Sequence, residues 1–295
     1  MPAAGRMSVR KAVITAAGLG TRLLPATKEM PKEMLPIYSV ISNGAIVLKP
    51  ILHVIFEELF NVGIRQFCFV VGRGKRSIED YFTPDYNYVD VLERRGKNKE
   101  ASALREFYKM VDSSVIVFVN QPEPRGFGDA VLKAEACVGD EPFILHAGDT
   151  FIFTNGGSYA RKILSLFEGS RPKAVLTLKK MPRPAKMYGY AVVEEEGNRL
   201  IVKRVVEKPD IPPSDLAIMA VYVFDPDIFD SIREVGPGVG GEIQLTDAIQ
   251  RLIDKGELVE AVILRDDELY FDVGSPETYW DALRVSYEQA ARRRT

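Results

Sequence analysis

One Gly- and Pro-rich stretch near the N-terminus constrains the fold of this chain more than any other. It opens with the apolar run Lys11–Ala16, which is typical of a buried β-strand. Gly18 and Gly20 follow directly, and a Gly-rich turn after a strand exposes backbone N–H groups to which an anion can bind. Arg22 and Lys32 come next, among prolines that disfavour a continuous helix. The stretch therefore predicts a stiff loop that directs positive charge at a phosphorylated ligand.

Two familiar phosphate-binding motifs do not fit this stretch. The dinucleotide-binding motif G-x-G-x-x-G requires a third glycine where this chain has Leu23, which disfavours an NAD-dependent oxidoreductase. The P-loop motif G-x-x-x-x-G-K-[S/T] does not occur. The two glycines alone also leave open an ordinary turn with surface cations.

The rest of the chain alternates between strand-like and helix-like segments. Strands are predicted at 66–71, 115–120, 143–146, 174–178, 190–193, 200–207, 216–224 and 259–264, and helices at 50–62, 75–82, 98–110, 128–138, 158–167, 245–253 and 275–292. This alternation predicts an α/β fold with a Rossmann-like, mixed but mainly parallel sheet flanked by helices. The later strands follow one another more closely, which favours a mixed sheet or an added β-layer in the second half.

Composition argues against several classes of function. The formal net charge of −2 disfavours nucleic-acid binding, and no apolar run approaches the roughly 20 residues that span a membrane. The N-terminus lacks an apolar signal core, so we expect a cytoplasmic protein that binds neither nucleic acid nor membrane. Cys68 and Cys137 lie in apolar contexts and are expected to be buried free thiols. His53 and His146 are expected to be structural, and a zinc site is disfavoured.

Three further sets of polar residues follow strand-like runs. Gln121 lies where ligands of α/β sheets bind, and its amide can donate and accept at once, as the edge of uracil or thymine requires. Asp149 and Asp272 each come after an apolar run, a position suited to holding Mg²⁺ against a triphosphate. Glu207 can accept hydrogen bonds from sugar hydroxyls, and Lys208 can pair with a phosphate. The alternatives are turn residues, a helix cap and a surface ion pair.

Taken together, these motifs resemble those of the sugar-1-phosphate nucleotidyltransferases. The family's G-x-G-T-R occurs at residues 18–22 as GLGTR, and its P-K-x-M-L-P occurs at residues 31–36 as PKEMLP. Further family motifs follow in the same order as far as about Leu283. The form of the second motif and of the residues before it is most similar to the bacterial-type UTP–glucose-1-phosphate uridylyltransferase branch.

The resemblance implies a reaction and a set of site residues. The reaction would form UDP-glucose and pyrophosphate from UTP and α-D-glucose 1-phosphate with Mg²⁺. Arg22 and Lys32 would be catalytic, and Asp149 and Asp272 would hold the metal. The nucleotide would be bound by Ala17, Gly18, Gly20, Thr21, Gln121 and Gly126, and the sugar phosphate by Gly189, Glu207 and Lys208.

The resemblance also implies an organisation and leaves alternatives open. We expect residues 1–7 to be a disordered tail and residues 8–295 to be a single domain. Its nucleotide-binding half would span about 8–150, and its sugar-binding half with the C-terminal helices about 151–295. The chain departs from the family at Asp129, where relatives have His or Gln, and at residues 40–47, which are expected to lengthen a loop. Use of dTTP in place of UTP and a non-catalytic sensor are the alternatives, and a homo-oligomer (a dimer or tetramer) is expected.

Overall fold

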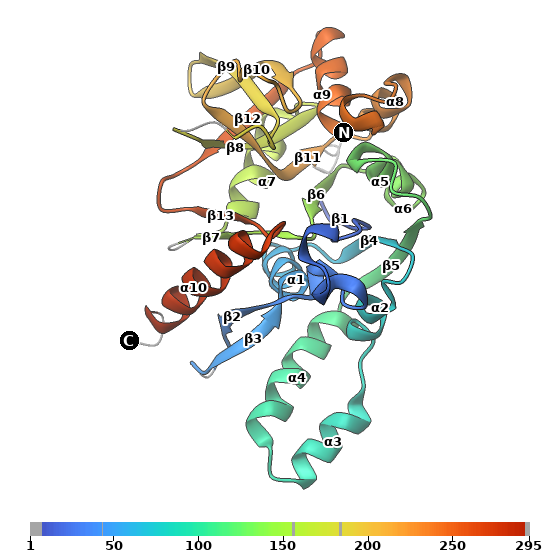
Figure 1. The fold of residues 1–295 in the computed structure, drawn as a ribbon, viewed down its shortest axis with the longest axis vertical. Coiled ribbons are helices and arrows are strands. Elements are labelled where there is room, and N and C mark those ends of the chain that lie inside the picture. The colour runs from blue at the N-terminus through green and yellow to red at the C-terminus, as the bar shows by residue number, and fades with distance from the viewer. Residues whose placement is uncertain (1–7, 43, 155–156, 183–184, 293–295) are drawn as a thin grey trace, which may run out of the picture.

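The computed structural model describes residues 8–42, 44–154, 157–182 and 185–292, and a nine-stranded sheet runs through its centre (Figure 1). The strand order is β5-β4-β1-β6-β11-β8-β12-β10-β9. These strands are β1 (Lys11–Ala16), β4 (Gln66–Gly72), β5 (Val115–Gln121), β6 (Phe143–Ala147), β8 (Ala174–Lys180), β9 (Tyr190–Glu196), β10 (Arg199–Val206), β11 (Leu216–Phe224) and β12 (Val259–Leu264). All of them lie where the sequence predicts strands, and the α/β fold is confirmed. The predicted tail at residues 1–7 lies outside the described residues.

Strand direction agrees with a mixed, mainly parallel sheet. β5, β4, β1 and β6 are parallel neighbours, and β8 and β12 form another parallel pair. β11 runs antiparallel between β6 and β8, and β10 runs antiparallel between β12 and β9. The carboxyl ends of β1, β4, β5 and β6 therefore meet at one edge of the sheet, where α/β proteins bind their ligands.

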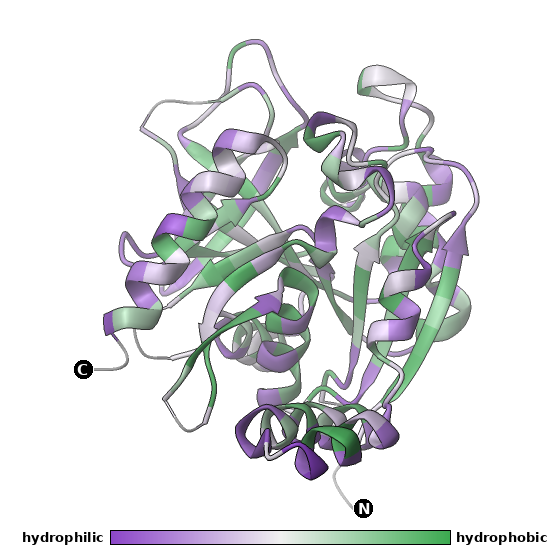
Figure 2. Ribbon diagram, turned by 60° about the horizontal axis from the view of Figure 1, so that its bottom comes forward, coloured by the Kyte–Doolittle hydropathy of each residue, from purple (hydrophilic) through white to green (hydrophobic). Residues whose placement is uncertain are grey.

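Helices cover both faces of the sheet. Buried residues of β1 alternate between two apolar clusters: Ile14 packs with α1 and α7, whereas Val13 packs with α5, α8 and α9. Such two-sided burial explains why the strands are continuous apolar runs. In Figure 2 the strands are correspondingly hydrophobic, and hydrophilic residues lie on the outer sides of the helices. The helices are α1 (Ile51–Asn61), α2 (Arg76–Tyr81), α3 (Tyr86–Arg94), α4 (Asn98–Asp112), α5 (Phe127–Lys133), α6 (Glu135–Val138), α7 (Tyr159–Ser170), α8 (Asp227–Glu234), α9 (Leu245–Asp254) and α10 (Pro276–Arg292).

Two small antiparallel pairs were not expected from the sequence. β2 (Pro36–Val40) and β3 (Ile46–Pro50) form a hairpin, so the two ends of the loop expected at residues 40–47 belong to strands. The hairpin is fixed by α10, because the Tyr279 hydroxyl donates to the Pro36 carbonyl at 2.9 Å. β7 (Thr150–Phe153) pairs with β13 (Leu269–Asp272), two short segments that are far apart in the chain.

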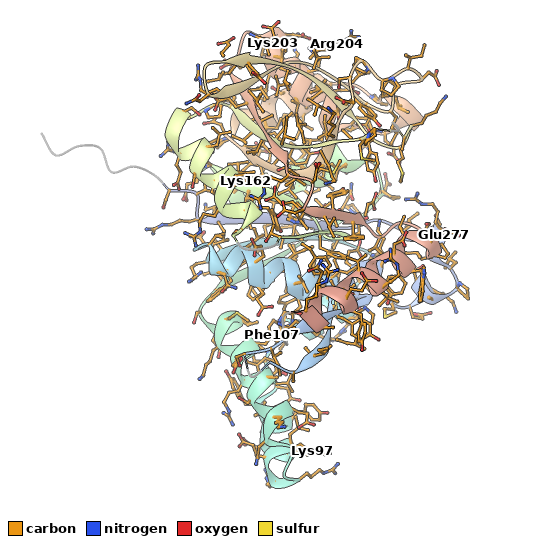
Figure 3. The ribbon with its side chains drawn as sticks, turned by 90° about the vertical axis from the view of Figure 1, so that its left-hand side faces the viewer. Lys97, Phe107, Lys162, Lys203, Arg204 and Glu277 are labelled. Atoms are coloured by element: carbon orange, nitrogen blue, oxygen red, sulfur yellow. The ribbon has the colours of Figure 1, made fainter. Side chains whose placement is uncertain are left out.

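Helices α3 and α4 form an arm that projects from the body of the molecule (Figures 1 and 3). Lys97 lies at its far end, and Phe107 lies near its base. Phe107 is buried and stacks on His53 with ring centroids 4.3 Å apart. The charged run at residues 93–99, around Lys97, is exposed. Across the described part of the chain, no helix is both long and apolar enough to cross a membrane.

Candidate active site

A pocket of about 500 Å³ opens at the carboxyl ends of β1, β5 and β6. It brings together most of the residues that the sequence singles out: Ala17, Gly18, Gly20, Thr21, Arg22, Lys32, Gln121, Gly126 and Asp149 all line it. Glu33, Phe127, Ala130, Glu242 and Gly274 also contribute to its wall. Asp272 lies beside this wall, whereas Gly189, Glu207 and Lys208 form a separate group.

The loop after β1 forms one wall of the pocket. Gly20 adopts a left-handed φ of 66°, and its carbonyl accepts a hydrogen bond from the Thr27 hydroxyl at 2.7 Å. Three short 3-10 helices at residues 21–23, 26–28 and 32–34 follow in place of one long helix, as the prolines predict. Arg22 is thereby extended across the pocket toward Gly274, where a Cβ atom would lie 2.7 Å from the Arg22 guanidinium.

Opposite charges are concentrated at the inner end of this loop. The Lys32 ammonium forms an ion pair with Asp149. Burial opposes charge on both groups, but their mutual attraction outweighs it, so the pKa of Lys32 is raised and that of Asp149 is lowered. Burial and the neighbouring Asp149 raise the pKa of Asp272 to about 6, although Lys32 and Arg22 act in the opposite direction. Asp149 and Asp272 therefore form a pair of neighbouring carboxylates beside the cations of Lys32 and Arg22.

The β7–β13 pair explains how two aspartates far apart in the chain come together. Asp149 immediately precedes β7, Asp272 ends β13 opposite Thr150, and the Val273 N–H donates to the Asp149 carbonyl at 3.0 Å. Two neighbouring carboxylates, one of which raises the pKa of the other, suit a divalent cation with oxygen ligands. Within the described ranges no group of three or more His, Cys, Asp or Glu side chains could hold a metal ion. The remaining ligands of such a cation would come from phosphate oxygens and water.

A second wall is formed where β5 leads into α5. Gly126 has a φ of 114°, and a Cβ atom there would lie 2.6 Å from the Ile243 carbonyl oxygen. The Gly128 N–H donates to that same carbonyl at 2.8 Å, so this segment lies directly against residues 242–244. Gln121 is buried, and its amide nitrogen donates to the Gly126 carbonyl at 3.2 Å and to Asp129 at 2.8 Å. These contacts to Ile243 and Asp129 were not predicted from the sequence.

The predicted sugar-phosphate residues lie together at the end of β10. The Glu207 carboxylate accepts a hydrogen bond from the Thr246 hydroxyl at 2.6 Å and lies 3.3 Å from the Lys208 ammonium. A Cβ atom at Gly189 would lie 3.0 Å from the same carboxylate, so glycine leaves room for it. Thr246 was not among the residues predicted for this site.

The histidines and cysteines lie outside this chemistry. In His146 the Nδ1–H donates to the Ala147 carbonyl at 2.7 Å, and Nε2 accepts from the Tyr159 hydroxyl at 2.8 Å. Burial lowers the pKa of His146 to about 4 and that of His53 to about 3, so both are neutral and structural, as predicted. Both cysteines are free thiols and Cys68 is buried, but Cys137 is only half-buried, so that part of the expectation is wrong. Cys137 lies on helix α6, a single short turn in which only Val138 is buried.

Comparison with known proteins identifies the class. The model of the nucleotidyl transferase family matches residues 11–289, so the chain belongs to this family. It is 40% identical over 256 residues to the UTP–glucose-1-phosphate uridylyltransferase of Streptococcus pyogenes, covering 83% of this chain and 78% of the relative. It is 36% identical over 284 residues to the enzyme of the same name from Pseudomonas aeruginosa, covering 95% of this chain and 96% of the relative. A crystal structure of UDP-glucose pyrophosphorylase complexed with UDP-glucose superposes with a TM-score of 0.79 at 31% identity, covering 95% of this chain and 99% of that chain.

Proposed function

We propose that this chain is a UTP–glucose-1-phosphate uridylyltransferase, which makes UDP-glucose and pyrophosphate from UTP and α-D-glucose 1-phosphate. The observation that carries the proposal is the single pocket wall that combines a Gly-rich loop, Arg22, Lys32 and Asp149 at the carboxyl ends of parallel strands. The names of the similar relatives support the same reaction. The fold and the charge distribution suit a phosphorylated nucleotide with its counter-ions.

The chemistry requires positioning and charge neutralisation more than proton transfer. The second pKa of a phosphate monoester is about 6, so glucose 1-phosphate carries an ionised oxygen near neutral pH. That oxygen attacks the α-phosphorus of UTP in line. The new bond joins it to the α-phosphorus, and the bond to the bridging oxygen breaks as pyrophosphate leaves. No general base is needed, which is consistent with a pocket lining that contains no histidine among the residues that the structure describes.

The charged residues receive distinct roles in this proposal. Arg22 holds the triphosphate and stabilises the leaving pyrophosphate, and Lys32 neutralises charge beside it. Lys208 pairs with the sugar phosphate, and Glu207 accepts hydrogen bonds from glucose hydroxyls. Asp149 and Asp272 would hold a divalent cation, for which we propose Mg²⁺, and this ion supplies positive charge against the phosphates when bound.

The nucleotide would lie along the Gly-rich loop, with its phosphates near the backbone of Ala17, Gly18, Gly20 and Thr21 and its base near Gln121 and Gly126. Thymine presents the same hydrogen-bonding edge as uracil. An additional methyl group changes discrimination by only ~1–3 kcal/mol, so we expect measurable turnover of dTTP beside UTP.

A pyrophosphate-release assay across UTP, dTTP, CTP, ATP and GTP, each with several sugar 1-phosphates, tests the proposal. The highest kcat/KM is expected for UTP with glucose 1-phosphate. Lys32→Ala should abolish most of this activity, whereas Lys28→Ala should retain it, because Lys28 is an exposed neighbour that does not line the pocket. Nucleotide binding without pyrophosphate release from any pair would instead favour a sensor.

We also propose that the protein forms a homodimer or homotetramer in the cytoplasm. An apolar surface supports self-association: Tyr287 of α10 stacks edge-on against Tyr38, whose partner in the hairpin is the exposed Leu48. Light scattering on a size-exclusion column tests this, and Tyr287→Glu should lower the measured mass. A wild-type protein with the mass of a monomer would contradict the proposal.

A further inference from the structure

The side chain of Gln121 is held in one orientation by two acceptors. Gln121 ends β5 and is 5% exposed, yet it contributes to the wall of the pocket. A primary amide has two N–H donors, and here one reaches the Gly126 carbonyl and the other reaches Asp129 Oδ2. Both donors are therefore used within the protein. The sequence predicts that this amide both donates to and accepts from the base. That prediction is wrong, because neither N–H is left to donate.

Asp129 determines which way the Gln121 amide is oriented. It is 3% exposed on the first turn of α5, and its other carboxylate oxygen lies 3.4 Å from the Lys133 ammonium one turn later. A carboxylate accepts hydrogen bonds but cannot donate them. A flipped amide would place its oxygen against the Asp129 carboxylate and the Gly126 carbonyl, and three buried acceptors would then face one another without a proton.

The consequence is a single free acceptor at the base-binding wall. Within the part of the chain that the structure describes, no group donates to Gln121 Oε1. Because both N–H groups of the Gln121 amide are hydrogen-bonded within the protein, its oxygen is the polar atom that remains for a ligand. Uracil and thymine carry an N–H at N3 that such an oxygen accepts, whereas cytosine carries a lone pair at the same position and is repelled.

We propose that Asp129 is a specificity-determining residue, which fixes the Gln121 amide so that its oxygen faces the base and thereby selects uracil or thymine over cytosine. This inference rests on the proposed role of Gln121 in reading the base. Asp129 itself does not touch the nucleotide in this account. It acts as a positioning residue, through the hydrogen bond to Gln121.

The test is the ratio of kcat/KM for UTP to that for CTP. Asp129→Asn keeps the size of the side chain but can turn its own N–H₂ toward Gln121, so the Gln121 amide is free to flip and to donate to cytosine. The ratio should fall by about tenfold, the scale of one hydrogen bond. The ratio of UTP to dTTP should not change, because both bases carry the N3 hydrogen. A general loss of structure would not move one ratio and leave the other.

A matched control and a double mutant separate the explanations. Lys133→Met removes the other partner of the carboxylate and should leave the UTP-to-CTP ratio unchanged. In a Gln121→Ala background, which should itself lower the ratio, Asp129→Asn should have no further effect on it. If Gln121→Ala lowers the ratio but Asp129→Asn does not, Asp129 does not fix the amide and the inference is overturned. If Gln121→Ala also leaves the ratio unchanged, the role of Gln121 in reading the base fails as well.

A measurement on the wild-type protein covers the case in which Asp129→Asn does not fold. The two side-chain amide protons of Gln121, assigned in NMR spectra by their loss in Gln121→Ala, should exchange slowly with solvent. They should remain protected after UTP is added, because both are bonded to protein oxygens. Rapid exchange of either proton in the free or the UTP-bound protein would overturn the inference.

Discussion

At the scale of single residues, the candidate site is dominated by charge in a buried setting. Lys32 and Asp149 form a buried ion pair, and burial together with the neighbouring Asp149 raises the pKa of Asp272. Ionisation of Asp272 is therefore less favourable than that of an aspartate in water. The same feature that disfavours this charge in the free protein would favour a divalent cation and its nucleotide.

The first prediction concerns the two aspartates. Asp149→Asn and Asp272→Asn should each lower kcat by ~100-fold or more, because charge stabilisation by a metal ion is worth several kcal/mol. Asp272→Asn should not lower the thermal midpoint, since it removes a carboxylate whose ionised form is disfavoured by burial. Titration of Mg²⁺ in the pyrophosphate-release assay measures the effect. Asp266→Asn, in the exposed turn before β13, is the control. Full activity in excess EDTA would show that the reaction needs no metal ion at these aspartates.

The second prediction concerns the sugar phosphate. Glu207→Ala should weaken glucose 1-phosphate by ~1–3 kcal/mol, the usual range for hydrogen bonds to a charged group. The KM for UTP should change little, because Glu207 does not line the nucleotide pocket. Thr246→Val keeps the carboxylate but removes its 2.6 Å hydrogen bond, so a smaller rise in the same KM is expected. Steady-state kinetics with each substrate varied in turn measure this, and an unchanged KM for the sugar phosphate in Glu207→Ala would refute the role.

The sequence was informative about residues that carry their chemistry in a local motif. Arg22 and Lys32 lie in short, ordered strings of residues, and the structure brings them to one pocket. Asp129 and Thr246 act through contacts to Gln121 and Glu207 that form only in the folded chain. Linear order marks Asp129 only as a departure from the family and does not mark Thr246 at all, so neither contact was predicted.

At the scale of elements, burial on both faces made the central strands easy to predict. β1 and β6 are almost wholly buried apolar runs, and short continuous apolar runs are typical of strands that are covered on both faces. The short strands β7 and β13 lack this signal, because a four-residue strand pairs only once distant segments have met. Helix α3 was also missed: Val89 is its only fully buried residue, and Leu92, one turn later, packs on the core while only partly buried.

The third prediction tests the contact between the start of α5 and residues 242–244. Gly126→Ala should destabilise the fold more than Gly139→Ala. Both residues have positive φ with an extended ψ, a conformation that costs an L-residue ~1–3 kcal/mol. At Gly126 the new Cβ would also lie within 2.7 Å of the Ile243 backbone nitrogen, whereas at Gly139 nothing lies within 4 Å. Urea unfolding measures the difference, and equal losses in the two variants would show that the close approach to Ile243 carries no weight.

At the scale of the whole molecule, the proposed nucleotide-binding and sugar-binding halves share one sheet. β6 of the first half pairs with β11 of the second, in register from Phe143↔Phe224 to His146↔Val221. Helix α10, near the C-terminus, packs on the hairpin of β2 and β3 near the N-terminus, where the Tyr38 N–H donates to the Ser286 hydroxyl at 3.1 Å. Neither half has a complete sheet without the other, which supports a single domain over residues 8–295.

The last prediction follows from this shared sheet. Unfolding in urea should be one cooperative transition, with far-UV circular dichroism and the fluorescence of the single tryptophan, Trp280, giving the same midpoint. Trp280 reports on α10, whereas circular dichroism reports on all elements, so agreement between them means that the halves unfold together. Saturating UTP should raise both midpoints equally, because a ligand that binds only the folded state stabilises everything that unfolds with its site. A fragment of residues 8–150 should not fold, since β6 would lose β11 and expose Leu145 and its buried neighbours. Two separate midpoints, or a folded fragment with native-like circular dichroism, would instead divide the chain into two domains.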